Sequence, residues 1–126
     1  MVNIVYSFGR MKVKDYDEYI ERYGLPLEPI LKKYNGKVLA ANKKGVIVEG
    51  EEEGNWTVLI EFASGKDAFE FYASPEYAPL KKMRLEELTD NALAISFPAE
   101  ISLEWKQFSP FFSSFYSKDL LRKKSN

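Results

Sequence analysis

Residues 56–63, WTVLIEFA, decide the fold of this chain, because their side chains alternate cleanly between two faces. One face carries four apolar side chains, those of Trp56, Val58, Ile60 and Phe62. Such a period of two is typical of a β-strand that has one side against a core. Ser64 follows and stands three residues before Asp67, the spacing at which a Ser side chain caps the start of a helix. The stretch therefore predicts a strand that leads directly into a helix.

The chain before this strand predicts a strand and a long helix. Residues 2–11 alternate as an extended segment. Asp15 then stands three residues before Glu18, a variant of the capping box that opens a helix. Apolar residues recur at helical spacing beyond this point, but Pro26 lacks a backbone N–H and crowds the preceding turn. We therefore expect the helix to break or kink near Pro26.

Three further segments complete the order of elements. Residues 37–48 predict a bent or bulged strand, or two short strands joined by a turn. After the helix that Ser64 opens, Ser74 and Pro75 start a second short helix, and residues 92–98 form a last strand. The order β-α-β-β-α-β is that of a ferredoxin-like α+β domain, in which a four-stranded antiparallel sheet carries helices on one face.

The second face of this sheet is expected to be open. The first and third strands stay partly apolar on that face. The residues assigned to it are Val5, Ser7, Met11, Thr57, Leu59 and Glu61. Because an apolar face of this kind favours burial against another surface, we expect a symmetric homodimer through the open sheet face.

The length and the composition divide the chain into two parts. A chain of 126 residues fits one domain, to which we assign residues 1–98. Residues 99–126 form an aromatic-rich C-terminal extension, in which Ser109 and Pro110 are able to start a helix. We expect this extension to act as a latch over apolar surface. The alternative is an amphipathic segment at a membrane surface, given the basic residues within 118–124.

The composition also excludes several classes of chemistry. The chain has no Cys and no His, which rules out thiolate catalysis, Ser-His-Asp triads and His-ligated haem or zinc. The acidic run 49–53 lacks alternating ligand geometry, so we expect no metal site and no cofactor. A net charge of -1 predicts no nucleic-acid partner. Without a signal-like start or a run of about 18 apolar residues, we expect a soluble cytoplasmic protein that does not insert into membranes.

Arg84 is the first candidate site residue, because its charge interrupts the apolar stripe of the second helical region. It lies seven residues after Tyr77 and four residues before Leu88. A buried guanidinium needs a carboxylate partner, a path to solvent or an anionic ligand. Glu61 and Glu49 are the candidate partners, and a structural ion pair or a path to solvent is the simpler interpretation.

Several tyrosines add phenol donors that would suit a small ligand in a cleft between helices and sheet. The candidate ligand-binding residues are Arg84, Tyr77, Glu61, Tyr6, Tyr19 and Tyr72. Helical spacing also explains most of these tyrosines as core residues, with the hydroxyl group at the rim of the core.

Three longer motifs occur in the order of the predicted elements. They are Tyr34-Asn35-Gly36-Lys37-Val38-Leu39, Val58-Leu59-Ile60-Glu61-Phe62-Ala63-Ser64, and Phe71-Tyr72-Ala73-Ser74-Pro75-Glu76-Tyr77 with Arg84 seven residues later. Over residues 1–98 this set resembles the domain-of-unknown-function 1330 family, which is placed in the dimeric α+β barrel superfamily. The family typically has two glycines where this chain has Asn35-Gly36, a change that a turn tolerates. The resemblance implies a dimer whose sheets face one another and brings no assigned reaction.

Three functional hypotheses fit the sequence. The first is a dimeric module that binds a small carboxylate or aromatic metabolite in the cleft beside Arg84. The alternative, by analogy with superfamily relatives, is a cofactor-independent enzyme of oxygenase, isomerase or cyclase type that acts on a small aromatic or ketide substrate. A third hypothesis is a regulatory or scaffolding partner reached through residues 99–126. Whether the chain is an enzyme stays open at this point.

Overall fold

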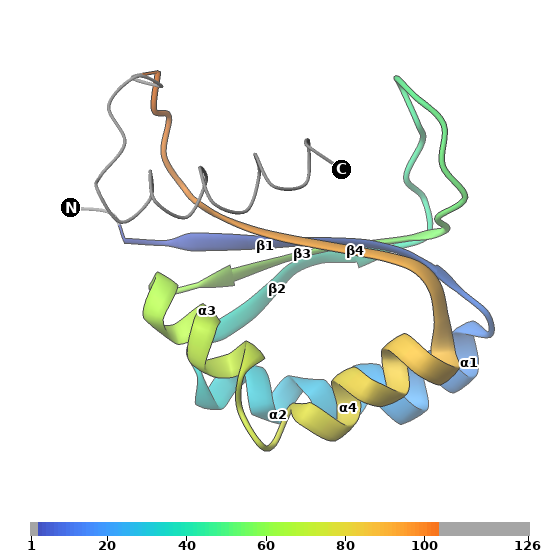
Figure 1. Ribbon diagram of the computed structural model, residues 1–126, viewed down its shortest axis with the longest axis horizontal. Coiled ribbons are helices and arrows are strands. Elements are labelled where there is room, and N and C mark those ends of the chain that lie inside the picture. Colours follow the sequence, from blue (N-terminus) through green and yellow to red (C-terminus); the bar gives the residue numbers. More distant parts are fainter. Residues whose placement is uncertain (1–2, 104–126) are drawn as a thin grey trace, which may run out of the picture.

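The computed structural model describes residues 3–103, which form one four-stranded antiparallel sheet with helices on one face (Figure 1). The strands are β1 (Val5–Val13), β2 (Gly36–Asn42), β3 (Trp56–Phe62) and β4 (Thr89–Pro98). The α-helices are α1 (Tyr16–Tyr19), α2 (Leu25–Lys33), α3 (Gly65–Tyr72) and α4 (Ala78–Met83), and the π-helical turns are η1 (Ile20–Gly24) and η2 (Arg84–Leu88). The strand order β2-β3-β1-β4 confirms the predicted ferredoxin-like α+β architecture.

The strand predicted most clearly from the sequence, β3, lies in the middle of the sheet between β1 and β2. Its last residue, Phe62, is the most buried core side chain among residues 3–103, at 1% exposure. The backbone N–H of Asp67 donates to the Ser64 hydroxyl at 3.1 Å, so the predicted helix cap is formed. The alternation in 56–63 thus gives the central strand, and the Ser64 cap gives the start of α3.

The assignment of β1 side chains to the two faces was wrong. The register pairs Val5 with Phe62, Ser7 with Ile60 and Met11 with Trp56, which puts this set on the helix-covered face rather than the open one. The open face of β1 instead carries Tyr6, Phe8 and Arg10, opposite Glu61, Leu59 and Thr57 of β3. Both faces of β1 are partly apolar, so the alternation of its residues does not show which face is turned to the helices. A shift of one residue in the pairing with β3 exchanges the two faces.

The predicted break near Pro26 is absent, because α1, η1 and α2 continue one into the next. The backbone N–H of Leu25 donates to the Ile20 carbonyl, an i to i−5 bond that makes the turn before Pro26 wider than an α-helical turn. Pro26 falls in the first turn of α2, where a missing N–H costs little. The π-helical turn therefore replaces the expected kink.

Only the first half of the segment predicted as a strand over 37–48 forms one, since β2 ends at Asn42 and no second strand follows before β3. The register of β2 against β3 shifts between Val38 and Ala40, which confirms the bulged form of the prediction. Residues 43–55 carry no strand, and Val46 and Val48 in this connection are exposed. The connection extends away from the sheet on its open side (Figure 1).

Two element boundaries differ from the predictions. Ser74 caps the backbone as expected, since its hydroxyl accepts from the N–H of Tyr77 at 3.1 Å, but α4 begins only at Ala78. β4 begins at Thr89, three residues earlier than predicted. The buried hydroxyl of Thr89 donates to the carbonyl of Arg84 at 2.8 Å, so this residue joins η2 to β4 instead of ending the helix in a loop.

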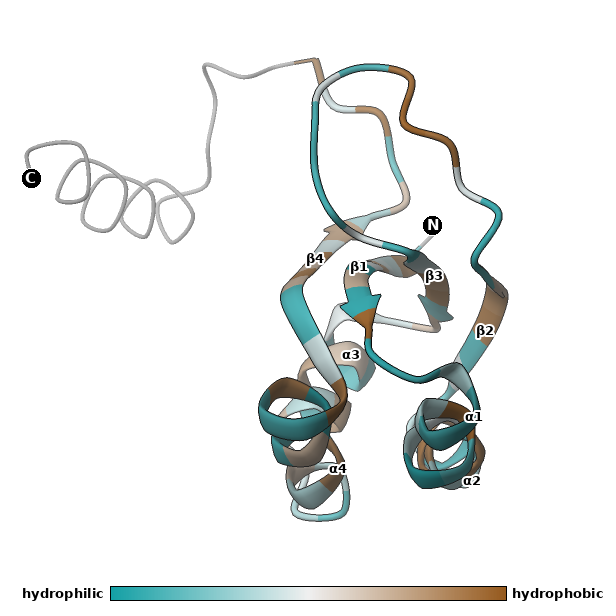
Figure 2. Ribbon diagram, turned by 90° about the vertical axis from the view of Figure 1, so that its right-hand side faces the viewer, coloured by the Kyte–Doolittle hydropathy of each residue, from teal (hydrophilic) through white to brown (hydrophobic). Residues whose placement is uncertain are grey.

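The helices lie in two groups under the sheet (Figure 2). The first group, α1 and α2, lies under the β2 side, and α4 lies under the β4 side (Figure 2). Within residues 3–103, no helix has the length and apolar character needed to cross a membrane. The predicted latch falls mostly on residues 104–126, outside the described part of the chain.

Candidate functional site

Arg84 is the first residue of η2, and its side chain points into the layer between helices and sheet at 4% exposure. Its Nη2 atom donates to the Tyr77 hydroxyl at 3.4 Å, and its guanidinium carbon lies 5.7 Å from the centre of the Tyr23 ring. Its buried Nε atom has no hydrogen-bond partner among the described residues. No carboxylate of residues 3–103 forms a salt bridge with it, so the structural ion pair expected with Glu61 or Glu49 is not formed there.

A cluster of phenols surrounds this guanidinium. The hydroxyl oxygens of Tyr23 and Tyr77 lie 2.7 Å apart, and the rings of Tyr19 and Tyr23 lie 5.1 Å apart. Burial raises the pKa of Tyr19 to about 12 and holds the pKa of Tyr23 well above its ordinary value. These phenols are therefore neutral at pH 7, and the guanidinium of Arg84 stays charged.

Local helical geometry brings these residues together. Tyr19 and Tyr23 are four residues apart and share one face of the first helical region. Tyr77 is held just before α4 by the capping hydroxyl of Ser74, which itself donates to the carbonyl of Phe71 at 2.8 Å. Arg84 follows Tyr77 by seven residues, which is two helical turns, so both side chains point to the same side.

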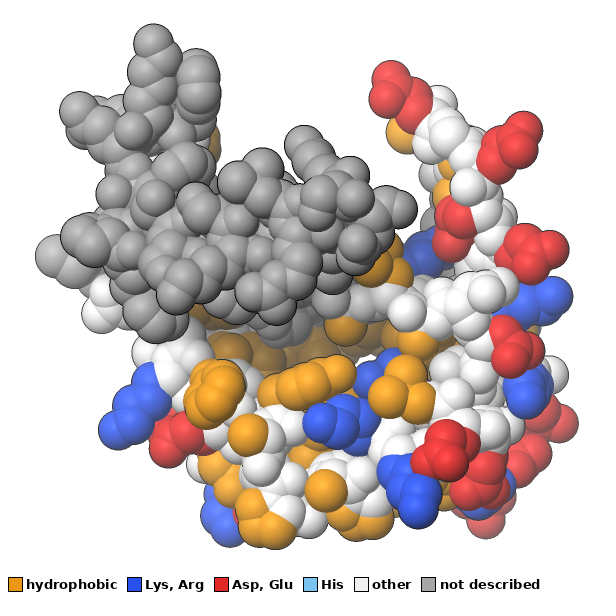
Figure 3. Space-filling view, in the orientation of Figure 1, with side chains coloured by type: hydrophobic (Ala, Val, Ile, Leu, Met, Phe, Trp, Pro, Cys, Tyr) orange, Lys and Arg blue, Asp and Glu red, His pale blue; other side chains and the backbone are white. Residues whose placement is uncertain are grey.

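A cleft of about 100 Å³ lies between these side chains and the sheet. Its floor is shaped by small residues, since Gly9 of β1 pairs with Ala94 of β4. A Cβ atom on Gly9 would lie 2.8 Å from the Val58 side chain, so the floor admits nothing larger without a shift. Ala94 and Ser96 are exposed, and the surface is hollowed beneath β4 with hydrophobic side chains around the hollow (Figure 3). The cleft therefore opens toward solvent at the β4 side.

The structure brings four of the six predicted site residues together. Arg84, Tyr77, Tyr19 and Tyr72 all line the cleft. The other two, Tyr6 and Glu61, are opposite one another in the β1–β3 register on the open face, and Tyr6 packs its ring against Phe97. Neither residue lines the cleft: Tyr6 lies on the open face because of the register of β1, and Glu61 lies on the open face to which the sequence assigned it.

Three residues that belong to the cleft were missed as site residues. Tyr23 lines the cleft, and its spacing of four residues from Tyr19 was a usable signal for it. Ser7 and Ser96 also line the cleft. Nothing in the sequence pairs these two serines, because they are brought together only by the register of β1 and β4.

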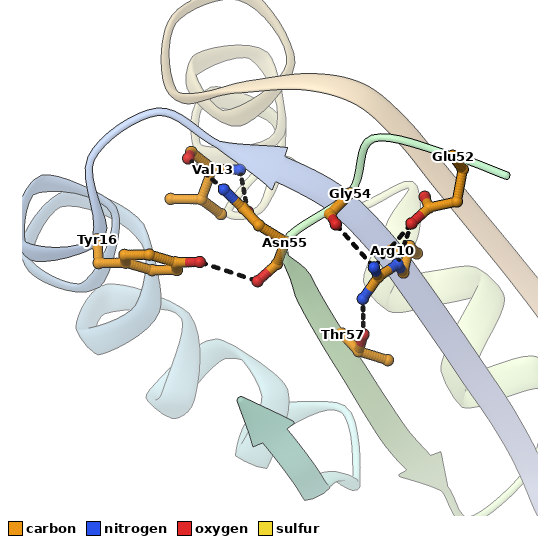
Figure 4. Close-up of polar contacts among 7 residues, drawn as sticks. All are labelled: Arg10, Val13, Tyr16, Glu52, Gly54, Asn55 and Thr57. Atoms are coloured by element: carbon orange, nitrogen blue, oxygen red, sulfur yellow. Dashed lines mark hydrogen bonds and ion pairs between the residues drawn. The ribbon is translucent and has the colours of Figure 1, made fainter. Parts of the chain in front are cut away.

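Arg10 provides a comparison within the same chain, on the open face of the sheet (Figure 4). Its guanidinium donates to the carboxylate of Glu52 at 2.7 Å, to the carbonyl of Gly54 at 2.7 Å and to the hydroxyl of Thr57 at 2.5 Å. The hydrogen bond from Arg10 also lowers the pKa of Glu52. Arg10 is thus fully paired in a structural role, whereas Arg84 is more deeply buried and has no carboxylate.

The neighbouring Asn55 ties the 43–55 connection to the end of β1 (Figure 4). Its side-chain amide accepts from the N–H of Val13 at 2.7 Å and donates to the carbonyl of Val13 at 3.1 Å. The Tyr16 hydroxyl donates to the backbone carbonyl of Asn55 at 2.9 Å. No group of three acidic side chains within residues 3–103 is placed to hold a metal ion.

The sheet order and the one-sided helices define a ferredoxin-like α+β protein with a cleft between its two layers. The sequence model of the family described as Domain of unknown function (DUF1330) matches residues 4–97, so the chain belongs to this family. No curated protein matches the chain.

Solved structures share this fold at low sequence identity. A protein of unknown function from Rhodopseudomonas palustris is 16% identical over 81% of this chain and 86% of its own, with a TM-score of 0.63. A hydroxynitrile lyase from Passiflora edulis is 18% identical over 82% of this chain and 99% of its own, with a TM-score of 0.63. SnoaB, a cofactor-independent oxygenase from Streptomyces nogalater, is 15% identical over 81% of this chain and 98% of its own, with a TM-score of 0.54. At these identities the likeness extends to the fold alone.

Proposed function

We propose that the protein binds a small organic carboxylate in the cleft, with Arg84 as the anion anchor. The observation that carries this proposal is the buried guanidinium that has no carboxylate partner among residues 3–103 and an unpaired Nε atom. A buried charge without a counter-charge costs several kcal/mol, so such a site is stabilised when an anion enters it. A carboxylate is able to accept from two guanidinium nitrogens at once.

The rest of the cleft suits the body of such a ligand. The phenol of Tyr77 lies next to the guanidinium and offers a further hydroxyl to an anion. The aromatic rings of Tyr19, Phe71 and Tyr72 line the remaining walls, which favours an apolar or aromatic body. The volume of about 100 Å³ is below the roughly 150 Å³ of an engineered cavity that holds benzene, so a ligand of that size would extend into the open mouth.

Binding is favoured over catalysis by the acid–base properties of the cleft. A general base works best with a pKa near the operating pH. The residues lining the cleft include no carboxylate, and burial raises the pKa values of Tyr19 and Tyr23 away from neutrality. The alternative, a cofactor-independent enzyme, would require the substrate to supply its own reactivity while Arg84 and Tyr77 stabilise a developing oxyanion. Product formation from a bound probe would support that alternative.

We further propose that the protein is a homodimer formed through the open face of the sheet. This face carries Phe8 and Leu59 at its centre and three half-exposed residues of β4, Leu93, Ile95 and Phe97. Contiguous apolar surface of this kind is typical of a surface that binds a partner, and a self-complementary patch forms a two-fold dimer.

A thermal-shift experiment with matched probes tests the anchor. Benzoate carries the charge, and benzamide has nearly the same shape without it. The matched variants are Arg84→Met and Arg22→Met, because Arg22 lies outside the cleft and pairs with Glu18 and Glu87 on the surface. We expect benzoate to raise the melting temperature of the wild type and of Arg22→Met but not of Arg84→Met, and benzamide to raise none. Equal shifts for the wild type and Arg84→Met would refute the anchor, as would the absence of any benzoate shift in the wild type.

A further inference from the structure

A pair of serine hydroxyls lies in the same cleft as Arg84, on the sheet side. Ser7 of β1 and Ser96 of β4 are cross-strand partners, and their hydroxyl oxygens lie 2.6 Å apart. Both residues line the cleft, next to the small floor formed by Gly9 and Ala94. Neither hydroxyl forms another hydrogen bond within the described part of the chain.

The pair has unused hydrogen-bonding capacity. Each serine hydroxyl carries one proton and two acceptor positions, and the mutual bond uses one proton and one acceptor position. One proton and further lone pairs therefore remain for a third group. In an otherwise aromatic and aliphatic lining, these hydroxyls are a second polar position that is separate from the guanidinium.

The two polar positions belong to opposite layers of the cleft, with the serine pair on the sheet and Arg84 on η2. Ser7, Gly9 and Met11 follow one another at every second position of β1, and the Tyr19 hydroxyl lies 3.9 Å from the Met11 sulfur. Four residues of strand span about 13 Å. This row sets the length of the cleft along β1, so with one hydrogen bond of about 3 Å at each end, at most about 7 Å remains between the two polar groups of a ligand that spans the cleft.

We infer that the carboxylate ligand carries a hydroxyl group at its far end, which binds to the Ser7–Ser96 pair. This inference rests on the proposed function, because it takes the carboxylate to be held by Arg84. The ligand class is thus a small hydroxycarboxylate with its two polar groups on opposite sides of an apolar or aromatic body. A para-hydroxy aromatic acid has this arrangement.

Calorimetric titration of three acids tests the inference. The probes are 4-hydroxybenzoate, benzoate and 3-hydroxybenzoate, in which the hydroxyl points in a different direction. We expect the wild type to bind 4-hydroxybenzoate about 2- to 10-fold more tightly than either of the other acids, the range of one net hydrogen bond. The double variant Ser7→Ala/Ser96→Ala removes both hydroxyls together, so no serine hydroxyl remains without its hydrogen-bond partner. We expect this variant to bind 4-hydroxybenzoate and benzoate with equal affinity, so that the preference is lost.

The outcomes separate this inference from the proposed function. If the wild type binds all three acids equally and Arg84→Met binds none, the inference is overturned and the anchor stands. If the double variant keeps the preference for 4-hydroxybenzoate, the inference is likewise overturned. If no acid binds the wild type, or if Arg84→Met binds as well as the wild type, the proposed function and the inference both fail.

Discussion

The Nη2 atom of Arg84 lies 3.4 Å from the hydroxyl oxygen of Tyr77, and within residues 3–103 this long contact is the one hydrogen bond of the guanidinium. The hydroxyl of Tyr77 also lies 2.7 Å from that of Tyr23. A cation, two hydrogen-bonded phenols and a small cleft therefore meet at one point between the helices and the sheet. The arrangement presents positive charge and hydrogen-bond donors to an anion.

We predict different effects on stability when the buried Arg84 and the half-buried Arg10 are replaced by methionine. Arg84→Met replaces an unpaired buried charge with an apolar side chain of similar length, so the free energy of unfolding without ligand should stay within about 1 kcal/mol or rise. Arg10→Met removes bonds to Glu52, Gly54 and Thr57 and should lower it by about 1–3 kcal/mol. Urea denaturation measures both. If Arg84→Met lowered the free energy of unfolding as much as Arg10→Met does, Arg84 would have a structural role.

Tyr77→Phe should lower the stability of the protein. The change removes the acceptor of the Arg84 bond and leaves the Tyr23 hydroxyl without its partner, which should lower the free energy of unfolding by about 1–2 kcal/mol. The double variant Tyr23→Phe/Tyr77→Phe leaves no unpaired phenol and should cost less than the sum of the single changes. Chemical denaturation of all four proteins gives the coupling energy. Strictly additive losses would contradict a coupled pair.

Stability should fall in alkaline solution because of the buried phenols. In the unfolded chain Tyr19 loses its proton near pH 10, whereas in the folded protein its pKa is about 12. Between these values the folded state holds the proton that the unfolded state has lost, so stability is full below pH 10 and decreases as the pH rises toward 12. Two pKa units correspond to about 2–3 kcal/mol for Tyr19, and Tyr23 acts in the same direction.

Denaturation curves recorded from pH 8 to pH 12 measure this loss, and Tyr19→Phe is the matched variant. Its slope in this range should be shallower than that of the wild type, because one of the shifted groups is gone. A wild-type stability that is constant up to pH 12 would contradict burial of these phenols.

The dimer proposal predicts that an acidic side chain on the open face gives a monomer. Ile95→Glu places a charge in the middle of that face, where burial of an unpaired charge is unfavourable. Leu25→Glu is the matched control, because it puts the same charge on an exposed position of α2, away from the sheet. Sedimentation velocity should report a dimer for the wild type and the control and a monomer for Ile95→Glu. A monomeric wild type, or a dimeric Ile95→Glu, would refute the interface.

Much of the fold was predictable because several local signals were unambiguous. The alternation in 56–63 fits only a strand, and the Ser64 spacing fits only the start of a helix. Both elements are formed. Arg84 was identifiable because a charge within an apolar helical stripe is unusual. The family resemblance, stated from motifs in 1–98, is confirmed over residues 4–97.

Other features depend on contacts that no local pattern encodes. The face of β1 depends on its register with β3, and this decided whether Tyr6 and Ser7 lie in the cleft. The turn before Pro26 depends on a shift from i−4 to i−5 hydrogen bonding, which apolar spacing does not distinguish from a kink. The division of the chain at residue 98, the latch and the cytoplasmic location stay predictions.

The most direct test of the account is the Arg84 Nε–H signal in an NMR titration with benzoate. The signal is assigned by its loss in Arg84→Met, and the Arg22 signal of the same spectrum is the internal control. Because the Nε atom has no partner among the described residues, we predict that its proton resonance moves downfield on binding of the carboxylate and saturates with the same dissociation constant as the other shifted signals. An Arg84 signal that stays in place while benzoate binds, or a spectrum that benzoate leaves unchanged, would contradict the account.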